Sequence, residues 1–157
     1  MNATPKREFF LTPEGIDKLK EELEELTGNK RAEIAQKLKE AKEYGDLSEN
    51  IQYDDAKDQQ AFIEGRISEI ENILRHASLI EAPADHKVVS LGSTVHLELE
   101  DGVQKYQIVG STEANPDEGK ISNESPIGKA LIGKKPGEEV EVTVPSGTMT
   151  YRIKKVE

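Results

Sequence analysis

Two carboxylates, Asp46 and Glu49, lie three residues apart in the segment Gly45-Asp46-Leu47-Ser48-Glu49-Asn50. At the start of a helix this spacing places both side chains on one side, close enough to share a partner. A carboxylate pair can bind Mg²⁺, which keeps several waters and often takes one or two carboxylates together with substrate phosphates. The pair is therefore an incomplete metal site, useful only if another molecule supplies the remaining ligands.

The same two residues also have a purely structural interpretation. Asp46 could be the N-cap of the following helix, and Glu49 could complete a capping box with it. Spacing alone favours the cap.

Other groups that could carry out chemistry are scarce. The chain has no cysteine, which excludes disulfides, thiolate metal sites and a cysteine nucleophile. Its three histidines, His76, His86 and His96, are expected in a helix end, a linker and a strand, without acids at metal-binding spacing. No phosphate-binding glycine loop follows a strand.

The charge balance excludes several classes of partner. The 157 residues include 21 Lys and Arg against 31 Asp and Glu, a net charge of -10. Free-standing nucleic-acid binders are usually basic, and so are proteins that bind anionic lipid. No stretch approaches the roughly 20 apolar residues of a membrane span, and residues 1–10 lack the apolar core of a secretory signal. We expect a cytoplasmic protein without a membrane partner.

The first half of the chain has the apolar spacing of a helical hairpin. Thr12-Pro13 is a helix start signal, and Tyr44-Gly45 is a stop signal. Between them, apolar residues recur at steps of three and four, at Ile16, Leu19, Leu23 and Leu26, and then one position late at Ile34, Leu38 and Ala41. The pattern falters at Gly28-Asn29-Lys30, where we expect a bend or loosening.

A second apolar series runs from Tyr53 to Ala77, after a connection of only a few residues. A short connection makes the two helices antiparallel neighbours. With about 30 residues in each helix, the hairpin would be ~45 Å long and would carry Asp46 and Glu49 at its tip.

The second half is predicted to be a small α+β domain. Segment 81–85 resembles a linker, and alternating segments follow, with turn signals at Asp101-Gly102 and Ser146-Gly147. Ser125-Pro126 predicts a short helix that ends at Gly133. The predicted fold class is α+β, with a helical domain at 1–80 and a second domain at 81–157.

Several motifs in this order resemble the GreA/GreB family of bacterial transcript cleavage factors. They span nearly the whole chain: Leu11-Thr12-Pro13-Glu14-Gly15, Gly45 to Asn50, Phe62 to Ile67, Tyr106 to Gly110, Gly119 to Ser122, and Ser125 to Gly133. The resemblance implies an antiparallel α-helical coiled-coil hairpin with an acidic tip, followed by an FKBP-like domain that docks on RNA polymerase.

The resemblance also implies a role for the tip. The hairpin would enter the secondary channel of the polymerase, and Asp46 and Glu49 would help to hold a Mg²⁺ shared with the polymerase active centre. Backtracked RNA would then be cut near its 3′ end, by an activity that the factor lacks alone. Ser48 and Asn50 would support the tip, and Lys42 and Lys57 would face the nascent RNA. We expect a monomer.

The chain departs from the family beside the tip. Positions that often hold His and Ala are Asp54 and Asp55 here, and Asp58 follows. These acids would weaken the basic patch that faces the RNA, or tune metal affinity or the fit to this polymerase. They could equally be solvated helix charges.

Three other functions are weighed against transcript cleavage. A channel-binding inhibitor of the same fold is opposed by the retained Asp46 and Glu49, but the additional Asp54 and Asp55 leave it open. A peptidyl-prolyl isomerase would need an aromatic pocket, but only Tyr106 and Tyr151 are aromatic after residue 80. A structural coiled-coil adaptor is opposed only by the tip and the resemblance.

Overall fold

The computed structural model describes residues 8–45, 50–83 and 85–157. It forms two compact units: a helical unit, Ile16–His76, and a sheet unit, which joins Met1–Gly15 to Ala77–Glu157. Residues from both sides of the predicted boundary at 80 therefore meet in the sheet unit. No helix in the described ranges is long and apolar enough to cross a membrane.

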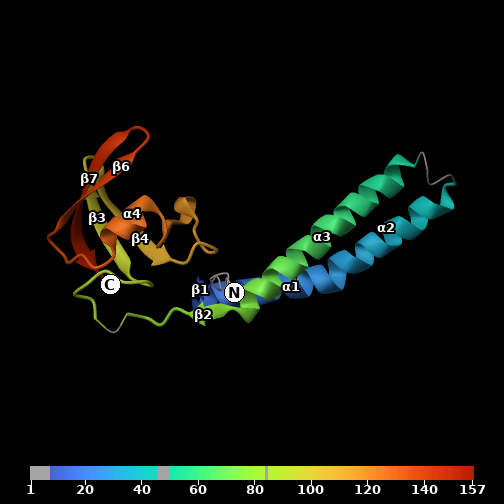
Figure 1. Ribbon diagram of the computed structural model, residues 1–157, viewed down its shortest axis with the longest axis horizontal. Coiled ribbons are helices and arrows are strands. Elements are labelled where there is room, and N and C mark those ends of the chain that lie inside the picture. Colours follow the sequence, from blue (N-terminus) through green and yellow to red (C-terminus); the bar gives the residue numbers. More distant parts are fainter. Residues whose placement is uncertain (1–7, 46–49, 84) are drawn as a thin grey trace, which may run out of the picture. The chain divides into compact units, whose positions relative to one another are not determined.

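The helical unit is built from the predicted hairpin (Figure 1). α1 (Pro13–Glu25) passes through a π-helical turn, η1 (Leu26–Lys30), into α2 (Arg31–Glu43), and α3 (Ile51–Arg75) returns. A π-helical turn holds one extra residue within an otherwise α-helical path. This explains why the apolar series resumes one position late, and it confirms the predicted irregularity at Gly28.

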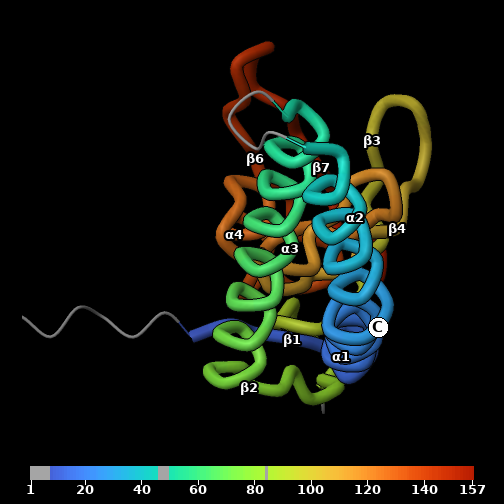
Figure 2. The backbone as a smooth tube through the Cα atoms, turned by 90° about the vertical axis from the view of Figure 1, so that its right-hand side faces the viewer, coloured from blue at the N-terminus to red at the C-terminus, as the bar shows by residue number. Residues whose placement is uncertain are grey.

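The two long arms run antiparallel, as Figure 2 also shows. Arg31 of α2 pairs with Glu64 of α3, and Lys37, further along α2, donates to Gln59, which comes earlier in α3. Residues later in α2 therefore contact residues earlier in α3, as in an antiparallel pair. The apolar seam is buried at Ile34, Ala41, Ala56, Ile67, Ile70 and Ile73. The second series was predicted to extend to Ala77, but α3 ends at Arg75 and Ala77 begins a strand.

The sheet unit contains a five-stranded sheet in the order β5-β4-β3-β7-β6. Neighbouring strands are antiparallel except β4 and β5, which are parallel. The strands are β3 (Thr94–Leu99), β4 (Gly102–Val109), β5 (Lys120–Ser122), β6 (Glu139–Val144) and β7 (Gly147–Val156). Gly102 and Gly147 have φ of 126° and 132°, which favours glycine and confirms both predicted turns.

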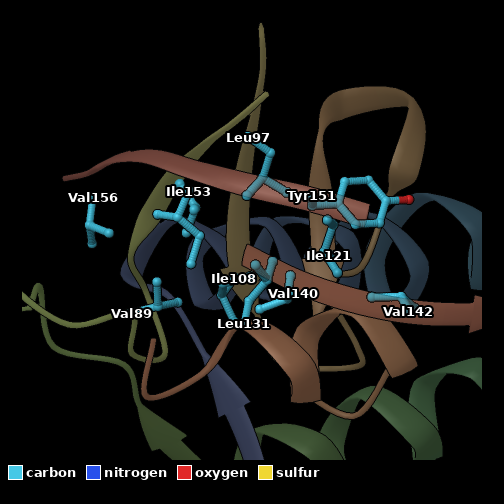
Figure 3. Packing of buried hydrophobic residues seen from close by; sticks show 11 residues of the cluster. Val89, Leu97, Ile108, Ile121, Leu131, Val140, Val142, Tyr151, Ile153 and Val156 are labelled. Carbon is cyan, nitrogen blue, oxygen red and sulfur yellow. The ribbon is translucent and has the colours of Figure 1, made fainter. Parts of the chain in front are cut away.

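The core of the sheet unit lies between the sheet and the short helix α4 (Pro126–Leu131) (Figure 3). The Ser125 hydroxyl accepts a bond from the Gly128 N–H and caps α4, as the sequence predicts. The alternating residues of the strands supply most of the cluster, which comprises Val89, Val95, Leu97, Ile108, Ile121, Leu131, Val140, Val142, Tyr151, Ile153 and Val156. The α+β class is confirmed.

A second, two-stranded parallel sheet was not predicted. It pairs β1 (Phe9–Leu11) with β2 (Ala77–Leu79). Gly110, just after β4, lies against β1, and a Cβ at this position would come within 1.9 Å of the Phe10 carbonyl oxygen. A glycine is therefore required here for close backbone approach. Sequence reasoning also missed β5 and a short 3-10 turn, η3 (Pro116–Glu118).

Candidate functional site

The connection between α2 and α3 contains the sequence-predicted site. α2 ends at Glu43 with Tyr44 as its C-cap, and Gly45 follows with a φ of 116°. This left-handed glycine ends the helix, as the sequence predicts. Asp46, Ser48 and Glu49 lie outside the described residues, which continue from Asn50.

Asn50 joins the two helix ends. Its side-chain oxygen accepts a bond from the Tyr53 N–H at 3.2 Å, which makes Asn50 the N-cap of α3. Its amide nitrogen donates to the Ala41 carbonyl oxygen at 2.6 Å, in the last turn of α2. The side chain therefore adds a hydrogen bond at the start of α3 and another at the end of α2, where backbone bonds to Tyr53 and Ala41 are also made.

The capping interpretation of Asp46 is therefore wrong. α3 begins at Ile51, so its N-cap lies four residues beyond Asp46, and the capping-box position falls at Tyr53 rather than Glu49. Asparagine caps a helix about as well as aspartate, so the helix needs no carboxylate at its start. A signal for this role was present in the sequence, because Asn is among the preferred N-cap residues.

The two predicted RNA-facing lysines lie on the arms next to this connection. Lys42 is exposed in the last turn of α2, where a positive charge is favourable, and it has no side-chain partner within the described part of the chain. Lys57 is exposed on α3, where its Nζ donates to Gln60 at 3.3 Å and lies 5.9 Å from the centre of the Tyr53 ring. Tyr53 and Gln60 thus hold Lys57 along α3.

The additional acids lie on the first turns of α3. Asp54 is exposed in the first turn, where the helix dipole favours a negative charge. Asp55 accepts a bond from Gln59 at 2.7 Å. Asp54 and Asp58 have no side-chain partner among residues 8–45, 50–83 and 85–157. Asp54 thus has a structural explanation, whereas Asp58 has none.

Two arginine–carboxylate pairs link the arms of the hairpin. Arg66 of α3 donates to both oxygens of Glu22 in α1 at 2.7 and 2.8 Å, and it also pairs with Glu69. Arg31 binds Glu64 with both distances at 2.7 Å. The hydrogen bonds from arginine lower the pKa of Glu22 and of Glu64. These two-pronged contacts have a specific geometry and add to the buried seam that packs α3 against α1 and α2.

A magnesium ion would fit the donor chemistry of the connection only in part. Carboxylate oxygens are the ligands that Mg²⁺ prefers, and Asp46 and Glu49 would supply two of them. Across the described ranges, no three His, Asp or Glu side chains are grouped to hold a metal ion. The remaining ligands would have to come from water or from another molecule.

The comparisons with known proteins cover both units. Residues 9–79 match the family model "Transcription elongation factor, N-terminal", and residues 84–157 match "Transcription elongation factor, GreA/GreB, C-term". A "Transcription elongation factor GreA" of Listeria welshimeri is 53% identical over 151 residues, which are 94% of each chain. The Bacillus subtilis protein of the same name is 52% identical over 150 residues, 94% of this chain and 96% of that one.

A similar solved structure is the crystal structure of GreA factor homolog 1 of Thermus thermophilus. It is 34% identical and covers 96% of this chain and 99% of its own, with a TM-score of 0.44. The two family models together span nearly all of the described chain, and the relatives match along nearly their full length. The chain belongs to the GreA/GreB family of transcription elongation factors.

Proposed function

We propose that this elongation factor stimulates transcript cleavage by RNA polymerase. The hairpin enters the secondary channel of the polymerase and presents Asp46 and Glu49 to its active centre. There the polymerase cuts backtracked RNA near the 3′ end, and the new end restarts synthesis. The factor has no nuclease activity alone and acts as a monomer.

The observation that carries this proposal is the hairpin with two acids in its connection. α3 has 25 residues, which corresponds to ~37 Å of helix. Asn50 caps α3 and binds the end of α2, so the hairpin needs neither Asp46 nor Glu49 for its own helix ends. Two carboxylates in the connection of a long hairpin, next to a helix that Asn50 caps, suit delivery into the active site of another protein.

The residues of the connection would divide the work. Asp46 and Glu49 add negative charge and oxygen ligands where a Mg²⁺ is shared with the polymerase. Bound Mg²⁺ supplies charge stabilisation to the attacking and leaving oxygens of a phosphodiester. Lys42 and Lys57 offset the repulsion between acids and RNA phosphates, while Ser48 and Asn50 offer hydrogen bonds to RNA or water.

The direct test uses a stalled, backtracked polymerase complex with labelled RNA and Mg²⁺. Adding the factor should shorten the RNA from its 3′ end, release a fragment, and allow extension once nucleotides are supplied. A parallel reaction with the factor and free RNA should show no hydrolysis. Binding to the complex without faster cleavage would contradict the proposal and support the channel-binding inhibitor instead.

A further inference from the structure

The outward face of α3 carries an exposed series with the same spacing as the buried seam. Its members follow one another at alternating steps of four and three residues, so they share one face of the helix. All of them are exposed. We call this face the outer stripe, and it comprises Ile51, Asp55, Asp58, Phe62, Gly65 and Glu69.

Two large apolar side chains of the outer stripe have no packing role within the described part of the helical unit. Ile51 is 82% exposed and Phe62 is 77% exposed, because the buried seam of α3 lies on the other side of the helix. Beside Phe62 lies an open hollow of about 530 Å³, lined by Ala61, Phe62, Gly65, Arg66 and Glu69. An aromatic side chain at the edge of a hollow is typical of a protein contact surface.

Gly65 has no explanation within the fold. It lies in the middle of α3 without a positive φ, and no atom outside its immediate surroundings lies within 4 Å of the place where a Cβ would be. Glycine in a helix interior is destabilising relative to alanine. A glycine that the fold does not need, one turn from an exposed phenylalanine, allows a partner to approach the helix backbone closely.

The charge of the outer stripe identifies the kind of partner. Asp55, Asp58 and Glu69 are acidic, and Asp58 has no partner in the described part of the chain. Arg66, the basic residue at the hollow, is already bound to Glu22 and Glu69. RNA would be repelled by this face, and so would the same face of a second copy.

We infer that the outer stripe docks on a basic polypeptide segment of the polymerase, in the wall of the passage that the hairpin enters. An apolar side chain of that segment fills the hollow over Gly65 against Phe62, and lysine or arginine side chains pair with Asp55 and Asp58. This inference rests on the proposed function, because it assigns the contacts of the arm to the protein rather than to RNA.

The test titrates full-length variants against the backtracked complex and separates half-saturating concentration from maximal cleavage rate. Phe62→Ala should raise the half-saturating concentration about tenfold and leave the maximal rate unchanged. Asp55→Asn combined with Asp58→Asn should weaken binding at low salt and flatten its salt dependence.

Gly65→Ala separates docking from folding. Because alanine favours helix, this variant should melt about 2–8 °C higher than wild type. It should nevertheless bind the complex more weakly, since the added methyl group keeps the side chain of the partner away from the helix backbone at the floor of the hollow. Gly28→Ala is the matched control: a Cβ there also has open space around it, and this variant should bind as wild type does.

The outcomes of these titrations are distinct. If wild type stimulates cleavage and both Phe62→Ala and Gly65→Ala keep wild-type half-saturation, the docking surface is wrong while the proposed function stands. If wild type neither binds nor stimulates cleavage, the proposed function itself fails. If Phe62→Ala weakens binding of free RNA, the occupant of the outer stripe is RNA and not the polymerase. If wild type is a dimer in sedimentation and Phe62→Ala dissociates it, the occupant is a second copy of the chain. Either result would overturn the inference.

Discussion

At the scale of single residues, Asp46 and Glu49 differ from the other acids beside them because they lie in the connection between the arms. Asp46→Asn and Glu49→Gln keep the size of each side chain and remove the charge that a Mg²⁺ needs. We expect either change to slow cleavage of a backtracked complex by about 100-fold or more, and to raise the Mg²⁺ concentration for half-maximal rate. Binding to polymerase should stay near wild type.

The same variants separate chemistry from stability. Because Asn50 caps α3, Asp46→Asn should leave the melting temperature unchanged. Glu43→Gln is a suitable control, since it removes one negative charge from the end of α2 without touching the acid pair. Wild-type cleavage by both Asp46→Asn and Glu49→Gln across the Mg²⁺ titration would remove these carboxylates from the mechanism.

The capping residue shows why this site could be predicted only in part. Asp46 and Asn50 are equally good caps by residue type, so local preference cannot decide between them. The choice depends on the bond from the Asn50 amide to the Ala41 carbonyl oxygen, which exists only once the arms have packed. Spacing placed the turn correctly between Gly45 and Asn50 because glycine and short connections carry a local signal.

At the scale of elements, the ion pairs between the arms predict how stability depends on pH. Arginine contacts lower the pKa of Glu22 and Glu64 in the folded state. Their contribution is therefore fully present above the unfolded pKa, near 4.5, and is lost as the pH falls through the lower folded values. Thermal melts should show a constant contribution from neutral pH to about pH 5 and a decline below it.

Glu22→Gln checks this assignment. It should lower stability at pH 7 by less than about 1 kcal/mol, because the pair is partly solvated, and it should reduce the loss on acidification. Glu24→Gln removes an acid of α1 that takes part in none of these pairs and should retain the wild-type profile. Equal acid sensitivity of Glu22→Gln and wild type would show that the pair does not contribute.

The π-helical turn makes a second prediction for an element. If η1 accommodates one extra residue, deletion of Gly28 should merge α1 and α2 into a continuous helix with the apolar seam in phase. The variant should remain folded, with a melting temperature near or above that of wild type. Circular dichroism at increasing temperature measures both the helix content and the transition.

Deletion of Gln36 is the matched control for that experiment. It removes an exposed residue from a regular α-helical segment and turns Leu38 and Ala41 by about 100° away from the seam. We expect a large loss of stability. If deletion of Gly28 were equally damaging, η1 would be a required part of the hairpin rather than an accommodated insertion.

These elements differ in how far the sequence could reveal them. The irregularity at Gly28 was predictable because a delay of one position is visible in a long periodic series. β1 and β2 were not, because each has three residues and its partner lies more than 60 positions away, at Phe9↔Ala77. Strands of three residues are too short to show the alternation of apolar and polar residues, and a parallel pairing between distant segments has no turn signal.

At the scale of the whole molecule, the charge and the division into units assign different tasks to the two halves. The chain carries a net charge of -10, so attraction to nucleic acid cannot place it on a transcription complex. The helical unit buries most of its apolar residues in its own seam and leaves Ile51 and Phe62 exposed on the outer stripe. The sheet unit has an independent core, whose eleven buried residues all fall between Val89 and Val156. We therefore expect the sheet unit to supply the main attachment to polymerase.

A fragment comprising residues 81–157 tests this division. It retains the five-stranded sheet, α4 and the complete core cluster, and loses the small β1-β2 sheet together with Ile80 and the Thr12–Glu113 bonds, so it should melt cooperatively but at a lower temperature than the sheet unit of the full chain. Added to a backtracked complex, it should compete with the full-length factor and support no cleavage, because it lacks Asp46 and Glu49. Its affinity should fall below that of the full chain by the contribution of the outer stripe. Full affinity in residues 1–78 alone would instead place the attachment on the hairpin.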